Sequence, residues 1–89
     1  MVPVVPSGAS QFTRSLTVGS QGEDVRDLQK FLNTKGFLIS SEGSGSLGNE
    51  TTFFGSLTKN ALAKYQASVG ISPAVGYFGL LTREYINTH

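Results

Sequence analysis

Apolar residues recur at intervals of three and four along three stretches of this chain, the spacing of one helical face. The first stretch is centred on Val25, Leu28 and Leu32. In the second, the positions that fall within one face about 100° wide are Thr58, Ala61, Leu62, Tyr65 and Val69. In the third, the apolar positions are Leu81, Tyr85 and Ile86. We therefore predict a mainly α fold, a compact three-helix domain.

Residues with helix-capping character lie at the ends of these stretches. Two devices fit the start of the first helix, a capping box of Ser20 with Glu23 or a cap at Gly22, and the spacing does not choose between them. Gly55 stands at the start of the second helix and Gly70 at its end. Each helix is thus predicted to be short.

One motif introduces both the second and the third helix. The stretch Phe53-Phe54-Gly55-Ser56-Leu57-Thr58-Lys59 returns 24 residues later as Tyr77-Phe78-Gly79-Leu80-Leu81-Thr82-Arg83. In each copy we interpret the inner Phe as a core residue and the Gly as a turn that lets backbone approach closely. The Thr hydroxyl suits backbone groups left unpaired at a helix start. The internal repeat is therefore interpreted first as a device of the fold.

A segment of small polar residues separates the first two helices. Residues 41–49 hold three glycines and three serines, which predicts a long Gly/Ser surface loop. The flanking residues 37–40 and 51–54 favour β structure, so a minor short β-hairpin between them is a secondary expectation. Asn49-Glu50-Thr51 matches the acceptor pattern for N-glycosylation, a tripeptide that also arises freely by chance.

The chain is predicted to hold one domain. Residues 1–11 carry two of the three prolines, several small residues and no charge, which is typical of a linker or an added terminal segment. Residues 12–89 form the domain, and a chain of 89 residues buries enough surface for one core.

The composition argues against catalysis and metal binding by this chain. It has no cysteine, and its one histidine is the final residue, His89. Nucleophiles that depend on His or Cys, and zinc sites of ordinary ligand count, are therefore not expected. The acidic residues Glu23, Asp24 and Asp27 gather at a helix start, where they complement the helix dipole. We expect no catalytic residue, no metal and no cofactor.

Charge and hydropathy narrow the partners. Seven Lys and Arg against six Asp and Glu give a net charge of +1 without a basic block, which disfavours nucleic acid. No apolar run approaches the roughly 18 residues of a membrane span. We expect no membrane insertion and a monomer, and any export signal would lie outside this chain.

The ordered set of residues resembles a known family. The order runs Leu16-x-x-Gly19-x-x-Gly22-x-Asp24-Val25-x-x-Leu28-Gln29-x-x-Leu32, then Gly36-Phe37, Phe54-Gly55-x-x-Thr58-x-x-Ala61-Leu62-x-x-Tyr65-Gln66, Gly70-Ile71 and Gly76-x-Phe78-Gly79-x-x-Thr82. It is similar to the type 1 peptidoglycan-binding domain, a small bacterial three-helix domain, over roughly residues 12–89. Thr52 departs from the family pattern, which usually has Gly there, and Val75 stands where an acidic residue is common.

The resemblance implies a non-catalytic module that binds peptidoglycan, through its glycan strand or its stem peptide, and targets a larger protein to the wall. It implies a cell-wall, periplasmic or extracellular location. The alternative is a protein–protein adaptor that uses the same fold, with the groove between the helices receiving a peptide or a neighbouring domain. The pro-segment of matrix metalloproteinases has a related fold, but its inhibition requires a cysteine that this chain lacks.

The candidate binding residues lie beside the repeated ones. Phe53 and Tyr77 each precede a predicted core residue, so an extended backbone would turn them outward as aromatic platforms. The helix starts at Gly55 and Gly79 offer N–H groups to a stem carboxylate.

Four polar residues complete the candidate set. Lys59 and Arg83 follow one turn into the two helices, where their charges favour anions, and the loop residues Asn49 and Glu50 would add polar contacts. Gln29 and Gln66 also belong to the family pattern, and we interpret them as packing residues.

Overall fold

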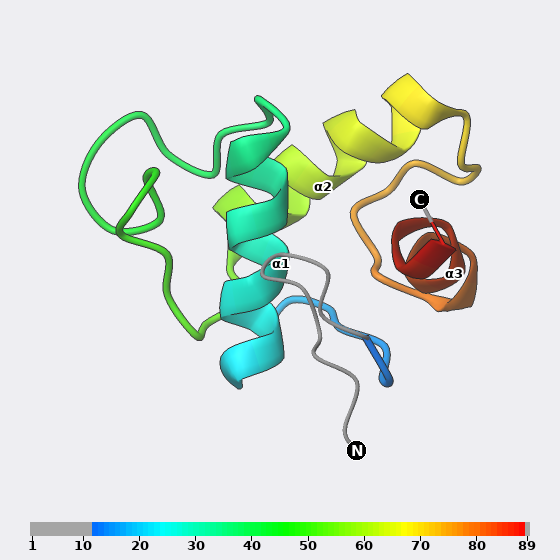
Figure 1. Cartoon of the computed structure of the whole chain (residues 1–89), viewed down its shortest axis with the longest axis horizontal. Helices are drawn as coiled ribbons and strands as arrows, with labels where there is room; N and C mark the ends of the chain where they lie inside the picture. The colour runs from blue at the N-terminus through cyan, green and yellow to red at the C-terminus, as the bar shows by residue number, and fades with distance from the viewer. Residues whose placement is uncertain (1–11, 89) are drawn as a thin grey trace, which may run out of the picture.

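The structure is a computed structural model that describes residues 12–88. It holds three α-helices, α1 (Glu23–Thr34), α2 (Ser56–Val69) and α3 (Leu80–Thr88), which confirms the mainly α, three-helix prediction (Figure 1). The linker predicted over residues 1–11 lies outside the described residues. Figure 1 shows α1 crossing α2, with α3 seen nearly end-on and the long loop on the far side of α1.

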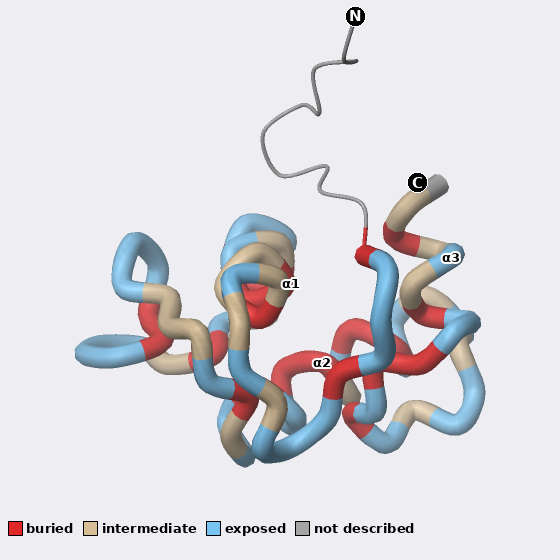
Figure 2. The backbone as a smooth tube through the Cα atoms, turned by 90° about the horizontal axis from the view of Figure 1, so that it is seen from below, coloured by how far each residue is buried: buried red, intermediate tan, exposed pale blue. Residues whose placement is uncertain are grey.

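One core joins the three helices and the segment that precedes them. Figure 2 shows the buried residues where these elements meet. The core side chains are Phe12, Leu16, Val25, Leu28, Leu32, Ile39, Phe54, Ala61, Leu62, Tyr65, Phe78 and Ile86. Phe54 and Phe78, the inner aromatics of the two repeat copies, are fully buried at 0% exposure, as the repeat predicted.

The helix ends show which capping devices the chain uses. Gly22 stands before α1 with φ 146°, a conformation that favours glycine, and no side-chain cap is present. The capping-box alternative is therefore wrong, and Ser20 Oγ instead accepts a hydrogen bond from Thr17 N at 3.0 Å. At their other ends α1 and α2 close alike, because Phe37 N donates to Leu32 O and Ile71 N to Gln66 O, both at 2.9 Å.

A short segment before α1, residues 16–22, pairs with both copies of the repeat. Leu16 and Phe78 exchange two backbone hydrogen bonds of 2.9 Å in an antiparallel bridge. Phe54 N donates to Ser20 O at 2.9 Å and Gly19 N to Phe54 O at 2.8 Å. The two helix starts are thus tied to one strip of backbone.

The hairpin expected between residues 37–40 and 51–54 is wrong within the described residues. The second of these segments pairs with residues 20–22 instead, through the bridge of Gln21 with Phe53. The first segment is turned toward the end of α1, because Ile39 N donates to the side chain of Asn33 at 2.8 Å. The backbone N–H groups of Phe37 and Ile39 are therefore both paired without a partner strand.

Leu81 is also not where the helical pattern put it. Its side chain is 62% exposed, whereas the neighbouring Thr82 is buried. Thr82 and Ile86, four residues apart, form the inner face of α3. The polar Thr takes the inner position because a buried amide group requires it there, as described below.

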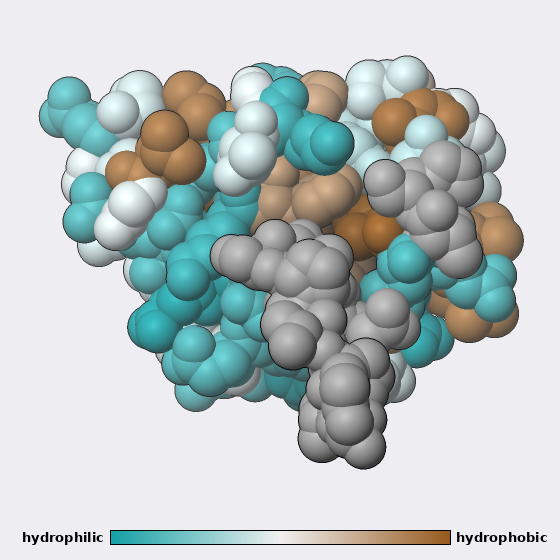
Figure 3. All heavy atoms as spheres, viewed as in Figure 1, coloured by the Kyte–Doolittle hydropathy of each residue, from teal (hydrophilic) through white to brown (hydrophobic). Residues whose placement is uncertain are grey.

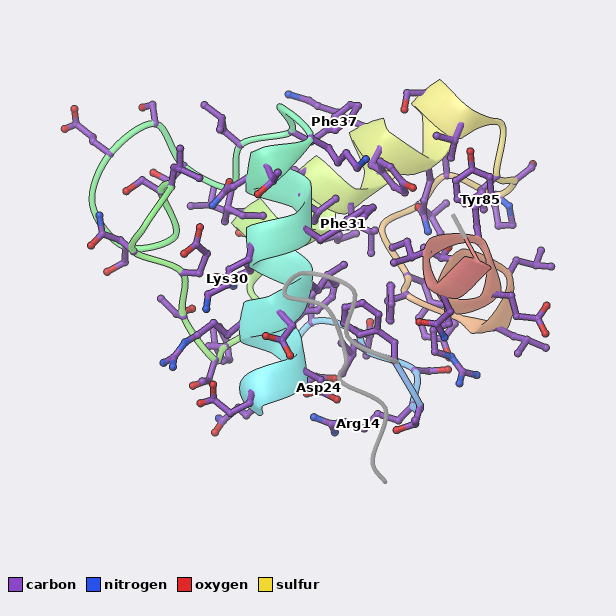
Figure 4. The ribbon with its side chains drawn as sticks, viewed as in Figure 1. Arg14, Asp24, Lys30, Phe31, Phe37 and Tyr85 are labelled. Atoms are coloured by element: carbon purple, nitrogen blue, oxygen red, sulfur yellow. The ribbon has the colours of Figure 1, made fainter. Side chains whose placement is uncertain are left out.

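The start of α1 is clamped to the chain that precedes it. Arg14 Nε donates to Asp24 Oδ2 at 2.6 Å, and Arg14 Nη2 donates to Asp24 Oδ1 at 2.9 Å (Figure 4). The hydrogen bond from Arg14 holds the pKa of Asp24 below its usual range. The Asp24 carboxylate therefore does more than complement the helix dipole.

The two ends of the described chain lie together beside α3 (Figure 2). Phe12 N donates to Asn87 Oδ1 at 3.0 Å, and Asn87 Nδ2 donates back to Phe12 O at 3.1 Å. The Phe12 ring packs edge-on against Phe78, with ring centroids 4.9 Å apart. These contacts close the domain.

Candidate functional site

A buried glutamine on α1 organises the first copy of the repeat. Gln29 Nε2 donates to Phe53 O at 2.9 Å and to Thr58 Oγ1 at 3.0 Å. Its Oε1 accepts a hydrogen bond from Thr51 N at 2.6 Å. One amide therefore fixes the backbone before the turn, the turn itself and the first turn of α2.

A second glutamine, on α2, does the same for the second copy. Gln66 Nε2 donates to Tyr77 O at 2.8 Å and to Thr82 Oγ1 at 2.9 Å, while Gly76 N donates to Gln66 Oε1 at 2.9 Å. Both glutamines are buried. The packing role expected of them is confirmed, and they are the inner partners of the two threonines.

The outer aromatic of each copy lies over the glycine two residues further on. A Cβ placed on Gly55 would lie 3.1 Å from Phe53 Cε2, and one on Gly79 would lie 2.6 Å from Tyr77 Cε2. Phe53 and Tyr77 are each 49% exposed, in contrast to their buried neighbours Phe54 and Phe78. The backbone alternation predicted for these pairs is confirmed, with the Cδ2 and Cε2 atoms of each outer ring against the glycine and about half of the residue exposed.

Each outer aromatic stands at the edge of a pocket. The first repeat pocket, of about 280 Å³, has Gln29, Phe53, Gly55 and Thr58 among its lining residues. The second repeat pocket, of about 200 Å³, is lined by the corresponding residues Gln66, Tyr77, Gly79 and Thr82. The repeat in sequence is therefore a repeat of hollows, each at the start of a helix.

The outer walls of the two repeat pockets differ. The long loop supplies Ser44 and Gly45 to the first pocket, beside Thr51. The link between α2 and α3 supplies Pro73 and Val75 to the second. The first pocket consequently has hydroxyl and backbone groups beside its apolar residues Ile39 and Leu57, whereas the link of the second pocket supplies mainly apolar side chains and one hydroxyl, that of Ser72.

Exposed leucines extend both pockets, and the sequence interpretation missed them. Leu57 in the first pocket and Leu81 in the second hold the same place in the repeat, and both side chains are mostly exposed. Leu80 and Val75 add to the exposed apolar surface of the second pocket. The sequence did contain a signal for these leucines, because they occupy equivalent positions in the two copies of the repeat. Leucines that only fill a core need not recur at a fixed place in a motif. Exposed apolar groups gathered at a hollow mark an interaction surface.

The predicted basic residues stand outside the pocket linings. Lys59 is exposed, and its backbone lies against the link before α3, where a Cβ on Gly76 would come within 2.5 Å of Lys59 O. Arg83 is half-buried, and its N–H makes the first helical bond of α3, to Gly79 O at 2.9 Å. Of the residues predicted for the site, the pockets bring together Phe53 with Gly55 and Tyr77 with Gly79.

The predicted loop residues serve the loop. Glu50 Oε2 accepts hydrogen bonds from Asn33 Nδ2 at 2.9 Å and from Gly48 N at 3.1 Å. Partial burial works to raise the pKa of Glu50, but the Asn33 and backbone hydrogen bonds outweigh it and hold the pKa below its usual range. Asn49 Nδ2 donates to Ser46 Oγ at 3.1 Å. Neither residue lines the first repeat pocket.

Within residues 12–88, no three His, Cys, Asp or Glu side chains are grouped so as to hold a metal ion. None of the helices in this part of the chain has the length and apolar character needed to cross a membrane.

A small helical domain with paired, aromatic-edged hollows belongs to the class of binding modules. A family model described as "Putative peptidoglycan binding domain" matches residues 21–86, which include both copies of the repeat and all three helices up to Ile86. The chain belongs to this peptidoglycan-binding family, as its resemblance to the type 1 domain indicated. Comparison with curated proteins and with solved structures gave no match in either case.

Proposed function

We propose that this domain holds a larger protein at the bacterial cell wall by binding peptidoglycan in its two repeat pockets. Family membership supports the ligand, and the duplicated pocket with a half-exposed aromatic at its edge supports the place. Such a module acts in the wall, the periplasm or the extracellular space, and supplies attachment while any chemistry belongs to the protein it carries.

The first repeat pocket suits a stem peptide. The first bond of α2 runs from Lys59 N to Gly55 O, and α2 has no side-chain cap, so the N–H groups of the exposed residues Ser56 and Leu57 have no partner within the helix. A stem carboxylate accepts from such groups and benefits from the helix dipole, with Lys59 one turn further on. Ser44 and Thr51 add polar partners, and Phe53 covers the apolar part of the ligand.

The second repeat pocket suits the apolar parts of the polymer. Peptidoglycan carries methyl groups on its N-acetyl substituents and on its alanine residues, and these match a wall of Pro73, Val75 and Leu81. The Tyr77 ring offers a face for a sugar and a hydroxyl for hydrogen bonding. Arg83, half-buried one turn into α3, contributes positive charge behind the helix start.

Sedimentation with purified sacculi tests this function. The domain is expected to pellet with sacculi that have been boiled in detergent, at low and at moderate salt, and to stay in solution without them. Retention on boiled sacculi also separates this function from that of an adaptor, since they carry no folded protein partner. A domain that remains in the supernatant at both salt concentrations refutes peptidoglycan binding.

Substitutions locate the binding surface. Tyr77→Ala and Phe53→Ala are each expected to reduce the pelleted fraction with little change in thermal unfolding, because both side chains are half exposed. Val18→Ala is the matched control, since Val18 is an exposed apolar residue that lines neither pocket. Equal losses for Val18→Ala and the two aromatic variants would contradict the assignment of the pockets.

A further inference from the structure

A third hollow lies apart from the repeat pockets, where the end of α1 meets α2 and α3. This aromatic groove, of about 280 Å³, is lined by residues that include Phe31, Lys35, Phe37, Tyr65, Ser68 and Tyr85. None of these residues lines a repeat pocket. Figure 4 shows that Phe31, Phe37 and Tyr85 come from three separate elements, and Figure 3 shows hydrophobic side chains at the surface between α1 and α3.

The rings are arranged around one buried tyrosine. The Tyr65 ring centroid lies 5.3 Å from that of Phe31, 5.6 Å from that of Phe37 and 6.3 Å from that of Tyr85. The interplanar angles are 87°, 82° and 68°, so the three outer rings stand steeply on Tyr65. The outer rings are half-buried while Tyr65 is buried, which leaves parts of their surfaces as upright walls.

The groove offers polar as well as apolar surface, because Lys35, Ser68 and the tyrosines Tyr65 and Tyr85 are among its lining residues. Ser68 Oγ donates to Tyr65 O at 2.7 Å, which leaves the hydroxyl oxygen able to accept from a ligand. A tyrosine hydroxyl is protonated at neutral pH and can donate a hydrogen bond, and Tyr65 lines the groove. A wall of rings with a few hydroxyls fits a sugar, whose ring has an apolar C–H face and a polar rim.

The charge of the groove selects the kind of sugar. Lys35 Nζ lies 5.6 Å from the centroid of the Phe31 ring, over the groove wall. Among the described residues that line the groove, Lys35 is the only charged one, and none of them carries a carboxylate. A ligand with a negative charge next to its ring is therefore favoured over a neutral one. The volume is below the roughly 300–1,000 Å³ of pockets that enclose drug-sized ligands, which suits one sugar ring.

We propose that the aromatic groove is a separate carbohydrate site, which holds a hexose ring that bears a carboxylate. The sugar ring packs against the aromatic walls, and its carboxylate lies at Lys35. N-acetylmuramic acid, the lactyl-substituted sugar of peptidoglycan, has this chemistry when its carboxyl group is free. The source of the sugar rests on the proposed function, but the site and its preference for an acidic ring do not.

A titration followed by amide NMR distinguishes this site from the repeat pockets. The probes are the disaccharide of N-acetylglucosamine and N-acetylmuramic acid, the neutral disaccharide of N-acetylglucosamine, and a free stem peptide. We expect the acidic disaccharide to shift the amides of Phe31, Lys35, Phe37 and Tyr85, and the stem peptide to leave them unchanged. Shifts confined to the repeat pockets, or no shifts up to the solubility of the acidic disaccharide, would overturn the proposal.

Two substitutions test the charge and the rings. Lys35→Met keeps the aliphatic stem and removes the ammonium group, so affinity for the acidic disaccharide should fall about two- to fivefold, as for an exposed ion pair. Affinity for the neutral disaccharide should be unchanged. Lys30→Met is the matched control, because Figure 4 shows Lys30 on the opposite side of α1 from Phe31. A Lys35→Met variant that binds the acidic disaccharide with wild-type affinity would contradict a role for the charge.

Phe37→Leu removes one ring face while keeping an apolar side chain, and a loss of about two- to tenfold in affinity is expected for both disaccharides. Unchanged affinity in a folded Phe37→Leu variant would remove the ring from the site. The outcomes also separate the two proposals. Binding of the acidic disaccharide in the groove without retention on sacculi would refute wall attachment and keep the groove, whereas retention on sacculi with a silent groove would do the opposite.

Discussion

The two copies of the repeat share an interior and differ in their outer walls. In each, a buried glutamine binds the backbone of the outer aromatic and the hydroxyl of the helix-start threonine. The glutamine and the outer aromatic are 24 positions apart in the first copy but only 11 apart in the second. The extra residues of the first copy form the long loop. In both copies, the hydrogen bonds of the glutamine fix the backbone geometry of the helix start. The segment that leads into each copy, either the long loop or the link between α2 and α3, determines the chemistry of the outer pocket wall.

The networks differ in one donor. In the first copy the glutamine oxygen accepts from Thr51 N, two residues before Phe53, and in the second from Gly76 N, one residue before Tyr77. Gly76 is buried against the backbone of α2, whereas Thr51 is only partly buried. The second copy is the tighter of the two, and each prediction below bears on that difference.

The largest effect is expected from the inner aromatics. Phe54→Ala and Phe78→Ala should each destabilise the domain by about 3–5 kcal/mol, because both rings are fully buried. Phe78 also packs against Phe12, so its loss should be the greater. Chemical denaturation of the two variants measures the order. A smaller loss for Phe78→Ala would contradict the view that the second copy is tighter.

The next effect concerns the link before α3. Gly76 has φ 80°, and a Cβ there would lie 2.5 Å from Lys59 O. Gly76→Ala should therefore cost about 1–2 kcal/mol for the left-handed backbone and about 1–3 kcal/mol for overpacking. Thr52 precedes Phe53 as Gly76 precedes Tyr77, and Thr52→Ala is the control, expected to change the free energy of unfolding by less than about 1 kcal/mol. Similar losses in both variants would show that the links are equally constrained.

The two glutamines allow the networks to be compared directly. Gln66→Leu leaves Gly76 N and Thr82 Oγ1 without their buried partner and should cost about 1–3 kcal/mol. Gln29→Leu should cost less, because the bond from Thr51 N to Gln29 is only partly buried and water can replace it, whereas the bond from Gly76 N to Gln66 is buried. Thermal unfolding of the two variants tests this order. The reverse order would mean that the loop of the first copy encloses its glutamine more fully than the link of the second.

The smallest predicted effect is a pH dependence of stability that distinguishes the first copy of the repeat from the second. The folded protein holds the pKa of Glu50 below its usual range, so ionised Glu50 stabilises the folded state above the ordinary Glu value of about 4.3. That contribution is lost as the pH falls through the lower pKa of the folded state. Wild type should therefore exceed Glu50→Gln in stability at pH 7, and the difference should vanish in acid. Asp24 has a pKa shifted in the same direction, so only this difference isolates Glu50.

The contribution of ionised Glu50 to stability, which is lost in acid, belongs to the first copy of the repeat. The link of the second copy, residues 71–76, contains no titratable side chain. Denaturation curves measured from pH 7 down to pH 3 for wild type and Glu50→Gln give the comparison. A difference between the two proteins that does not change with pH would show that the Glu50 carboxylate is not the stabilising species.

Sequence patterns predicted the helices and the inside-outside order of the repeat because both follow from local periodicity. Each inner Phe is buried and each outer aromatic is exposed, as adjacent residues of extended backbone require. The predicted hairpin does not form, because its two segments have other hydrogen-bond partners. Residues 16–22 make their contacts through backbone groups, and a pattern of side chains cannot reveal these. The prediction that Leu81 lies on the apolar face of α3 was wrong, because Thr82 takes the inner position and accepts a hydrogen bond from Gln66. This long-range polar contact overrides the apolar periodicity.

The candidate site was predictable in part. The exposed rings at Phe53 and Tyr77 followed from the repeat, but the pocket walls depend on loops whose course is set by contacts such as that of Asn33 with Glu50. The adaptor alternative placed a groove between the helices, but the sequence did not predict that aromatic rings would line it. Phe31 stands beside the apolar stripe of α1 and Phe37 follows the end of that helix, and only folding brings them to Tyr65 and Tyr85.

The closure of the chain on itself has a mechanical consequence. Phe12 binds Asn87, and Leu16 pairs antiparallel with Phe78, so the two ends leave the domain side by side. When tension is applied between those ends, the load falls on these hydrogen bonds one after another, as in the opening of a zipper. A module tethered at both ends would yield at low force, whereas one tethered at a single end would transmit tension through its ligand contacts alone.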